Sequence, residues 1–200
     1  VIAGSAFYGR TGLTEVIFPE GLVSIGPESF YYCIALENLQ IPDSVLLIED
    51  AAFAYAAALQ ELKIGNAVQR IGQKAFAFCG ELQSATLGQS VAEIGSYAFA
   101  ECDALRELRF RGNAPAIGEH PFDYYNYSAG GYTPIQRLTL YYPETAAGWT
   151  CPLWQGYPTA TWKPPVVFSD VIPGSWYAAS VDFVVSEGLM NGMSATSFAP

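Results

Sequence analysis

The stretch IGSYAFAEC (residues 94–102) decides the fold, because the same nine-residue phrase occurs twice more in the chain. It reads IGQKAFAFC at residues 71–79 and IGPESFYYC at residues 25–33. Phenylalanines recur every 23 residues over six copies, at Phe7, Phe30, Phe53, Phe76, Phe99 and Phe122. A fixed period of this length predicts a solenoid, because one such unit buries its apolar side chains only by stacking on its neighbours.

Each unit ends in a stretch such as LQELKI (residues 59–64), in which apolar and polar residues alternate. A spacing of two is the pattern of a half-buried β-strand. Strands of neighbouring coils are therefore expected to lie side by side at about 4.8 Å. Phe76 and Phe99 are expected to point into the coil interior.

The repeat register is interrupted after Phe122 by the insert DYYNYSAGGYT (residues 123–133). We predict that the phase slips by seven residues, because Ile135, Leu138 and Leu140 then resume the apolar pattern. This register places Arg137 beside Glu107 and Thr139 beside Arg109 in the sheet. The last copy is thus predicted to be a repeat with an enlarged loop.

The pattern L-x-x-L-x-I-P-x-x-V-x-x-I-G-x-x-A-F-x-x-C over residues 1–142 resembles the leucine-rich repeats of the BspA type, found in bacterial surface proteins. Local departures are Glu49 in a glycine column and Ala56 in a cysteine column. The resemblance implies an α/β-type repeat solenoid, a right-handed superhelix of about six 23-residue coils. Glycines such as Gly95 are expected to permit a tight turn before a short helical segment. Residues 143–162 are predicted to form a C-terminal cap over the open core.

The composition changes after residue 162. The stretch KPPVV (residues 163–167) predicts a stiff linker, because prolines hold an extended backbone. Residues 168–200 contain F-x-D-V, W-Y, an amphipathic helical pattern, G-L-M-N-G and F-x-P, and resemble an S-layer homology module. That family holds proteins on Gram-positive cell walls through a secondary wall polymer, and Asp170, Trp176 and Gly192 match its structural or ligand-contacting positions. The printed sequence ends where the second helix is expected, so we predict a partial module that does not bind wall polymer by itself.

Charge and motif content exclude several classes of function. With 9 Lys and Arg against 19 Asp and Glu, the net charge of −10 disfavours nucleic acid and anionic membrane surfaces. No apolar run approaches the roughly 20 residues of a membrane span, and the N-terminus lacks a signal-peptide layout. The first residues already fit the repeated phrase, so we expect a fragment of a longer protein. Catalytic motifs are absent, and one histidine without C-x-x-C predicts no metal site and no cofactor.

Three of the four cysteines, Cys33, Cys79 and Cys102, share one repeat column, while Cys151 follows the repeats. We predict buried free thiols that act as small apolar side chains. A disulfide between Cys79 and Cys102 is the alternative, because stacked coils bring their Cα atoms within range, although parallel side chains oppose it. The redox state of the cysteines stays open.

Two surfaces are candidates for ligand binding. The first is the concave strand face, at Asn38, Gln40, Glu61, Lys63, Glu107 and Arg109, for which a merely soluble face is an equal alternative. The second is the insert, at Tyr124, Tyr125, Tyr127 and Tyr132, because exposed tyrosines on loops anchor recognition surfaces. At least two of these four rings are expected to be solvent-accessible.

The predicted function is a non-catalytic recognition or adhesion module, secreted and displayed on a bacterial cell wall. Its expected partner is a host protein or glycan, with the wall polymer bound through the complete anchor region. A passive spacer and an accessory domain of a surface enzyme are the alternatives.

Overall fold

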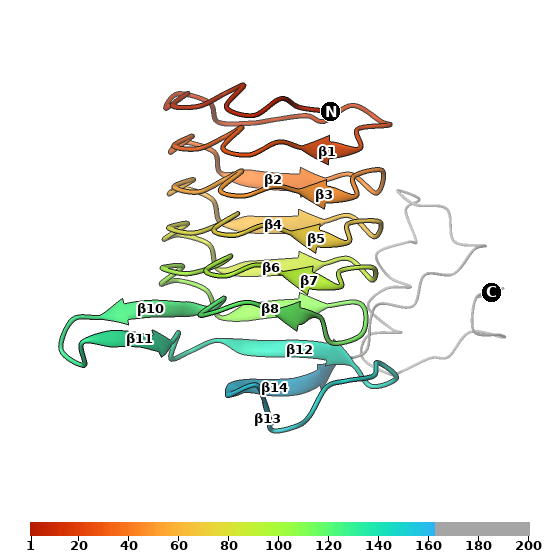
Figure 1. Ribbon diagram of the computed structural model, residues 1–200, viewed down its shortest axis with the longest axis vertical. Helices are drawn as coiled ribbons and strands as arrows, with labels where there is room; N and C mark the ends of the chain where they lie inside the picture. Colours follow the sequence, from red (N-terminus) through yellow and green to blue (C-terminus); the bar gives the residue numbers. More distant parts are fainter. Residues whose placement is uncertain (163–200) are drawn as a thin grey trace, which may run out of the picture. The chain divides into compact units, whose positions relative to one another are not determined.

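Pairing between strands of successive repeats defines the architecture, which is described for residues 1–162 by a computed structural model. Each regular coil contributes one longer and one shorter strand, so two parallel sheets run along the stack (Figure 1). The long sheet has the order β13-β14-β12-β8-β6-β4-β2, and its members are β2 (Asn38–Ile41), β4 (Glu61–Ile64), β6 (Ser84–Leu87), β8 (Glu107–Phe110), β12 (Thr139–Pro143), β13 (Leu153–Trp154) and β14 (Tyr157–Trp162). The short sheet comprises β1 (Ser24–Ile25), β3 (Leu47–Ile48), β5 (Arg70–Ile71), β7 (Glu93–Ile94) and β9 (Ala116–Ile117).

Strand register follows the 23-residue period of the sequence. Asn38 pairs with Glu61, and Ser84 pairs with Glu107, each one period apart. Buried and exposed residues alternate along β2 and β4, as expected for half-buried strands. The predicted solenoid of about six turns is confirmed, and the handedness of its superhelix stays a prediction.

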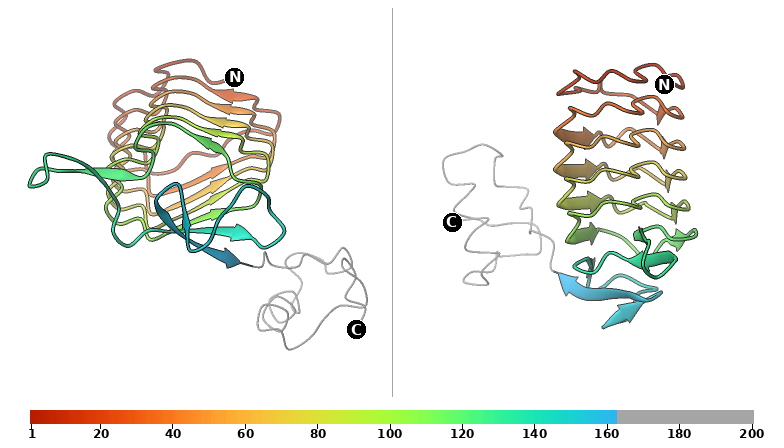
Figure 2. Two further views of the ribbon diagram at one scale, coloured as in Figure 1. Left: turned by 60° about the horizontal axis from the view of Figure 1, so that its bottom comes forward. Right: turned by 90° about the vertical axis from the view of Figure 1, so that its left-hand side faces the viewer.

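The phenylalanine column forms the centre of the core. Phe30, Phe53, Phe76 and Phe99 are fully buried. Their rings stack in sequence with centroid separations of 5.0, 5.3 and 5.2 Å. These separations follow the advance from one coil to the next, which is seen from two further sides in Figure 2.

The expected short helical segment is wrong, because residues 1–162 contain no helix and the AFAFC stretch forms turns. Lys74 and Phe78 have φ angles of 55° and 61°, which are incompatible with a right-handed helix. The amide groups of Lys74, Phe76 and Phe78 donate to the next coil, to Ser96 O, Ala98 O and Ala100 O. Every second amide of the segment therefore bonds to the next coil, while those of Ala75 and Ala77 bond within the coil, and the described unit is a β-solenoid.

The glycine of the repeated phrase is needed for a different reason from the one expected. Gly95 has no positive φ angle, but a Cβ atom on it would lie 2.6 Å from Gln73 N of the preceding coil. Gly72 has the same relation to Asp50 N, also at 2.6 Å. The glycine column is therefore explained by the close approach of two backbones. The turn begins after the glycine.

The predicted slip of seven residues is also wrong. Leu108 pairs with Leu140, which is 32 residues later and so nine more than the period of 23. Thr139 lies beside Glu107 and Tyr141 beside Arg109, while Arg137 precedes β12. The predicted slip of seven and the observed slip of nine differ by two residues. A shift of two keeps every side chain on the same face of a strand, so the apolar pattern fits both registers.

The cap continues the long sheet beyond the last repeat. β14 pairs in parallel with β12, and β13 pairs antiparallel with β14. Trp149 stacks on Tyr142 at 5.1 Å and lies 4.5 Å from Trp154, measured between ring centroids. This aromatic cluster covers the end of the core, and its boundaries at residues 143 and 162 stay predictions.

The expected linker and the helical S-layer homology segment, with Asp170, Trp176 and Gly192, lie outside the described residues. Within residues 1–162, no helix has the length and apolar character needed to cross a membrane.

Candidate functional site

A β-hairpin projects from the side of the stack where the coil turns lie (Figures 1 and 2). It consists of β10 (Asp123–Asn126) and β11 (Gly131–Pro134), paired antiparallel with Tyr125 opposite Tyr132. Asn126 closes the loop, because its Oδ1 accepts hydrogen bonds from the amides of Ser128 and Ala129 at 3.0 and 3.1 Å. We call residues 123–134 the tyrosine hairpin.

The four tyrosines of the tyrosine hairpin differ in exposure. Tyr127 is 89% exposed, Tyr125 and Tyr132 are each 37% exposed, and Tyr124 is partly buried against the core. The prediction that at least two rings are accessible is confirmed. Tyr125 meets Tyr127 and Tyr132 edge to face, at 5.0 and 5.3 Å between ring centroids, so these three tyrosines are not stacked on one another.

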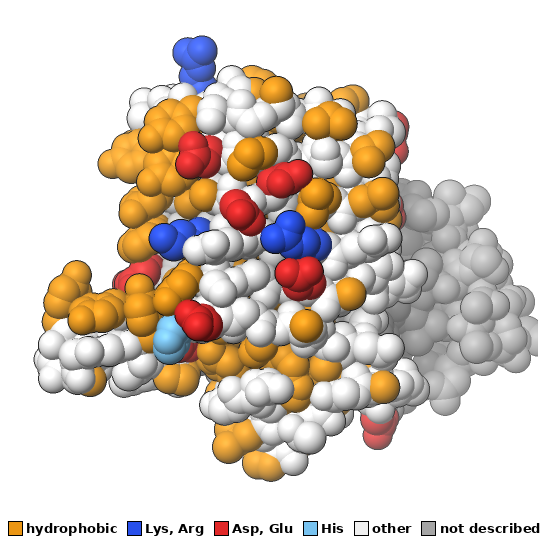
Figure 3. All heavy atoms as spheres, in the orientation of Figure 1, with side chains coloured by type: hydrophobic (Ala, Val, Ile, Leu, Met, Phe, Trp, Pro, Cys, Tyr) orange, Lys and Arg blue, Asp and Glu red, His pale blue; other side chains and the backbone are white. Residues whose placement is uncertain are grey.

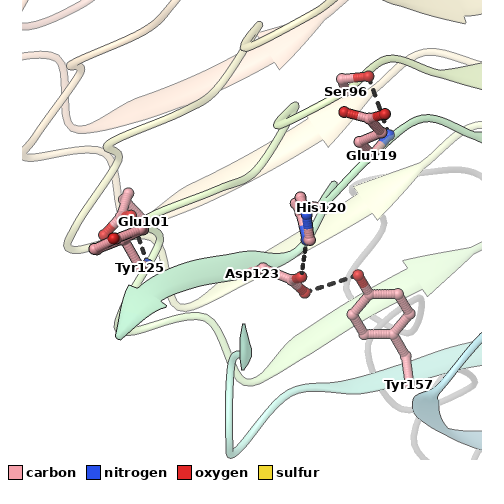
Figure 4. A network of polar contacts seen from close by, with 7 residues as sticks. All are labelled: Ser96, Glu101, Glu119, His120, Asp123, Tyr125 and Tyr157. Atoms are coloured by element: carbon pink, nitrogen blue, oxygen red, sulfur yellow. Dashed lines mark hydrogen bonds and ion pairs between the residues drawn. The ribbon is translucent and has the colours of Figure 1, made fainter. Parts of the chain in front are cut away.

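A buried carboxylate fixes the base of the hairpin (Figure 4). Asp123 is 5% exposed, and its Oδ1 accepts a 2.8 Å hydrogen bond from the hydroxyl of Tyr157 on β14. Its Oδ2 lies 2.8 Å from Nδ1 of His120. Burial, followed by the hydrogen bond with Asp123, raises the pKa of Tyr157 far above its ordinary value, so this side chain stays a neutral donor.

The hairpin is also tied to the last regular coil. The amide of Tyr125 donates to Glu101 Oε1 at 2.8 Å (Figure 4). The His120 ring stacks on Tyr132 at 4.8 Å between ring centroids. Tyr97 contacts the same Tyr132 ring at 5.2 Å. The base of the hairpin is therefore held by the cap and the repeats, whereas Tyr127 at the tip is left to solvent.

The six residues predicted on the strand face all lie on β2, β4 and β8, and the structure does not bring them all together. Four of them, Asn38, Gln40, Glu61 and Lys63, line a hollow of ≈ 780 Å³ between residues 14–20 and the first long strands. Glu107 and Arg109 on β8 do not line this hollow and pair with each other.

The charged residues predicted on the strand face form the pairs Glu61–Lys63 and Glu107–Arg109, whereas the hollow is also lined by Glu15, Glu20 and Glu37. Lys63 lies 3.9 Å from Glu61, with both side chains more than 60% exposed. Exposed ion pairs of this kind contribute little stability and are screened by salt. The predicted register paired Arg109 with Thr139. In the structure Arg109 pairs with Tyr141, so an aromatic residue that was not predicted there lies on this face.

A second group of exposed rings was missed in the sequence analysis. Tyr8, Tyr32 and Phe78 are 52, 46 and 39% exposed at the turns between the sheets. The signal was present, because Tyr32, Tyr55 and Phe78 follow one another at the 23-residue period.

The cysteines of residues 1–162 form no disulfide and belong to no metal-ligand cluster. All four are free, and Cys33, Cys79 and Cys102 are fully buried. Burial raises the pKa of the Cys102 thiol well above its usual range, which keeps it protonated. Residues 1–162 hold no group of three metal-ligating side chains.

Comparisons with known proteins agree with this geometry. A family model described as BspA type leucine rich repeat region matches residues 1–128 in six copies, and an S-layer homology domain model matches residues 167–200. A search of curated proteins found no match.

Two solved structures resemble the chain. One is a leucine rich repeat protein of T. pallidum, with 28% identity and a TM-score of 0.55 over 60% of this chain and 67% of that one. Another is a leucine rich cell surface protein from Faecalibacterium prausnitzii, with 20% identity and a TM-score of 0.49 over 73% of this chain and 53% of that one.

Proposed function

This chain belongs to the BspA-type leucine-rich repeat family, and from that premise we propose that its tyrosine hairpin recognises a host protein or glycan. The S-layer homology match at residues 167–200 indicates a cell-surface or cell-wall-associated repeat protein. Recognition of a partner outside the cell, and hence adhesion, is the role that such a location permits.

One observation carries the proposal: Tyr127 is 89% exposed at the tip of a hairpin whose base is held by buried contacts. A large ring left in water contributes little to folding. Tyrosine combines an apolar ring with a hydroxyl group and loses few rotatable bonds on binding, which is why it is enriched at recognition surfaces. A firmly held base lowers the entropic cost of presenting these rings.

The experiment compares wild type with the double variant Tyr125→Ser/Tyr127→Ser for binding to immobilised mucin, a glycoprotein that presents protein and glycan together. Tyr141→Ser is the matched control, because Tyr141 is a partly exposed tyrosine on the strand face. We expect the double variant to lose about tenfold or more in affinity and the control to bind normally.

Loss of binding in Tyr141→Ser alone would move the binding surface to the strand face of Asn38, Gln40, Glu61, Lys63, Glu107 and Arg109. Unchanged binding in both variants, or none by wild type, would favour the passive spacer. Deglycosylated mucin separates the glycan from the protein partner.

Wall anchoring is proposed for the region that contains Asp170, Trp176 and Gly192, through a secondary wall polymer of Gram-positive cells. Since the sequence matches only the first part of the pattern, the 200-residue chain is expected to bind isolated wall material no better than a chain ending at Trp162. Sedimentation with purified walls checks this, and clear excess binding by the longer chain would contradict it.

We also propose that the repeat unit is non-enzymatic, because its sequence has no catalytic motif. The accessory role beside a surface enzyme stays open to a test with the full-length protein, in which a catalytic domain outside these residues would support it.

A further inference from the structure

A row of aromatic rings follows the coil turns at the edge of the stack. Tyr8 stacks on Tyr31 at 5.0 Å, and Tyr55 stacks on Phe78 at 4.4 Å. Tyr55 also lies 5.3 Å from Tyr31 and 5.6 Å from Tyr32, so the five rings are connected. We call Tyr8, Tyr31, Tyr32, Tyr55 and Phe78 the corner column; hydrophobic side chains gather along this side of the molecule in Figure 3.

The fold does not require rings at these turns. Tyr32, Tyr55 and Phe78 have φ angles of 64°, 64° and 61°, a conformation that bulky side chains rarely adopt. The same turn in other coils carries Gly9 at 68° and Glu101 at 59°. A small or polar residue therefore completes this turn equally well, and aromatic residues are present at a conformational cost.

Stacking in the corner column covers ring faces, so ring edges and the hydroxyl groups of the four tyrosines are the groups available to a partner. In the stacked pairs the interplanar angles are 11° for Tyr8 and Tyr31 and 3° for Tyr55 and Phe78, so facing ring surfaces cover each other. The edge of an aromatic ring is the positive end of its quadrupole, and a phenol hydroxyl donates a hydrogen bond. Both attract oxygen lone pairs.

The spacing of the rings restricts the shape of a partner. Contacting rings are separated by 4.4 to 5.6 Å, close to the advance per coil. An extended peptide advances by about 3.3 Å per residue and falls out of step within two coils. An extended β-1,4-linked hexose chain advances by a similar distance per sugar and turns alternate sugars over, so such a chain keeps step with the coils and presents equivalent oxygens at every second coil.

Charge narrows the partner further. The chain carries a net charge of −10, which repels polyanions and opposes the association of two copies. The charges at the turns themselves are mixed, because Lys74 occupies on the coil of Phe78 the repeat position that Glu28 holds on the coil of Tyr31, and Glu101 follows Phe78 by one period. The most compatible partner is thus an uncharged polymer rich in oxygen atoms.

We propose that the corner column is a second binding site, which takes a linear, neutral, β-linked polysaccharide lying along the stack. Its source is outside the cell, because the S-layer homology region already matches a family that binds the cell's own wall polymer. This site does not depend on the recognition role of the tyrosine hairpin.

The test is affinity electrophoresis through gels that contain hydroxyethyl cellulose, a soluble neutral β-linked glucan. The ladder variant Tyr32→Asn/Tyr55→Asn/Phe78→Asn removes three rings and places asparagine, which tolerates positive φ, at each turn. We expect wild type to be retarded, the ladder variant to lose about tenfold or more in affinity, and its melting temperature to be unchanged or higher. The matched control is Ile17→Asn, which replaces a side chain that is 85% exposed on another face.

Three further gels define the partner. Carboxymethyl cellulose, which is anionic, and glycogen, which is α-linked, are expected to cause little retardation, as is a gel containing solubilised peptidoglycan. Absence of retardation by hydroxyethyl cellulose, or equal retardation of wild type and ladder variant, would overturn the proposal. Retardation in the peptidoglycan gel alone would also overturn it. The proposal would fail as well if only a protein partner, and no polysaccharide, covered the corner column.

The hairpin proposal has a separate readout. The double variant Tyr125→Ser/Tyr127→Ser is expected to keep its affinity for hydroxyethyl cellulose while losing mucin binding. If the ladder variant binds both probes like wild type, the polysaccharide site fails and the hairpin site stands.

Discussion

The regular coils and the hairpin with its cap are held together in different ways. Between coils, each contact recurs: Phe53 stacks between Phe30 and Phe76, and Phe76 between Phe53 and Phe99. In residues 111–162 the decisive contacts occur once, such as Tyr157 with Asp123 or the Trp162 indole with Phe110 O at 3.0 Å. Stability in the first region is therefore a sum of similar interfaces, whereas in the second it depends on individual pairs.

The largest expected effect is in the repeats. Phe76→Ala removes a fully buried ring that contacts two neighbouring coils, and should lower the free energy of unfolding by about 3–5 kcal/mol through lost burial and a cavity. Phe99→Ala should behave similarly. Guanidinium unfolding followed by circular dichroism measures the change.

Phe78→Ala is the matched control, since Phe78 lies two residues away but is 39% exposed. It should cost less than about 1 kcal/mol. Equal costs for Phe76→Ala and Phe78→Ala would show that the repeat core is wrongly assigned.

A smaller effect is expected where the hairpin meets the cap. Tyr157→Phe leaves the buried Asp123 carboxylate without its hydroxyl donor and should cost about 1–3 kcal/mol. Tyr141→Phe, which removes a hydroxyl from the strand face, serves as the control and should be nearly neutral. If Tyr157→Phe were equally neutral, the hairpin would not be anchored through this contact.

The same pair predicts a dependence on alkaline pH. Since the pKa of Tyr157 is raised in the folded protein, the unfolded chain loses this proton first as the pH rises. The stability conferred by neutral Tyr157 is thus fully present below the unfolded pKa of about 10 and declines above it. The stability difference between wild type and Tyr157→Phe should shrink from pH 9 to higher pH, and a constant or growing difference would contradict this.

Thiol reactivity separates the two regions without any substitution. Cys33, Cys79 and Cys102 are buried in the repeats, whereas Cys151 in the cap is exposed. Titration with Ellman's reagent should show one fast thiol in the native protein and four after unfolding. Two fast thiols, or only two after unfolding, would indicate an opened repeat or a disulfide.

The smallest effect is expected at the hairpin tip. Tyr127→Ser alters a ring that is 89% exposed and should change the free energy of unfolding by no more than about 0.5 kcal/mol. A larger loss in thermal unfolding would mean that the ring packs on the stack, and the tyrosine hairpin would then be part of the cap.

The sequence was sufficient for the repeats because their environment is local and periodic. The 23-residue phenylalanine column predicted the buried rings, and alternation in ELKI predicted β4. The sequence also predicted exposed tyrosines on the insert, because a segment that interrupts the regular register is free of the packing that holds the coils. The strand-face residues lie on the predicted strands, yet only the structure shows that Glu107 and Arg109 lie apart from the hollow lined by the other four.

The tertiary structure decided what depends on a neighbouring coil. The AFAFC stretch has local helix-forming residues, but the amides of Phe76 and Phe78 bond to the next coil, so it forms turns with left-handed residues. The sequence does not determine the register of β12, because shifts of seven and nine residues bury the same face of the strand and differ only in the pairing with β8. Alternation along one strand is written in the sequence, whereas the choice among equivalent pairings is made by contacts with other parts of the chain.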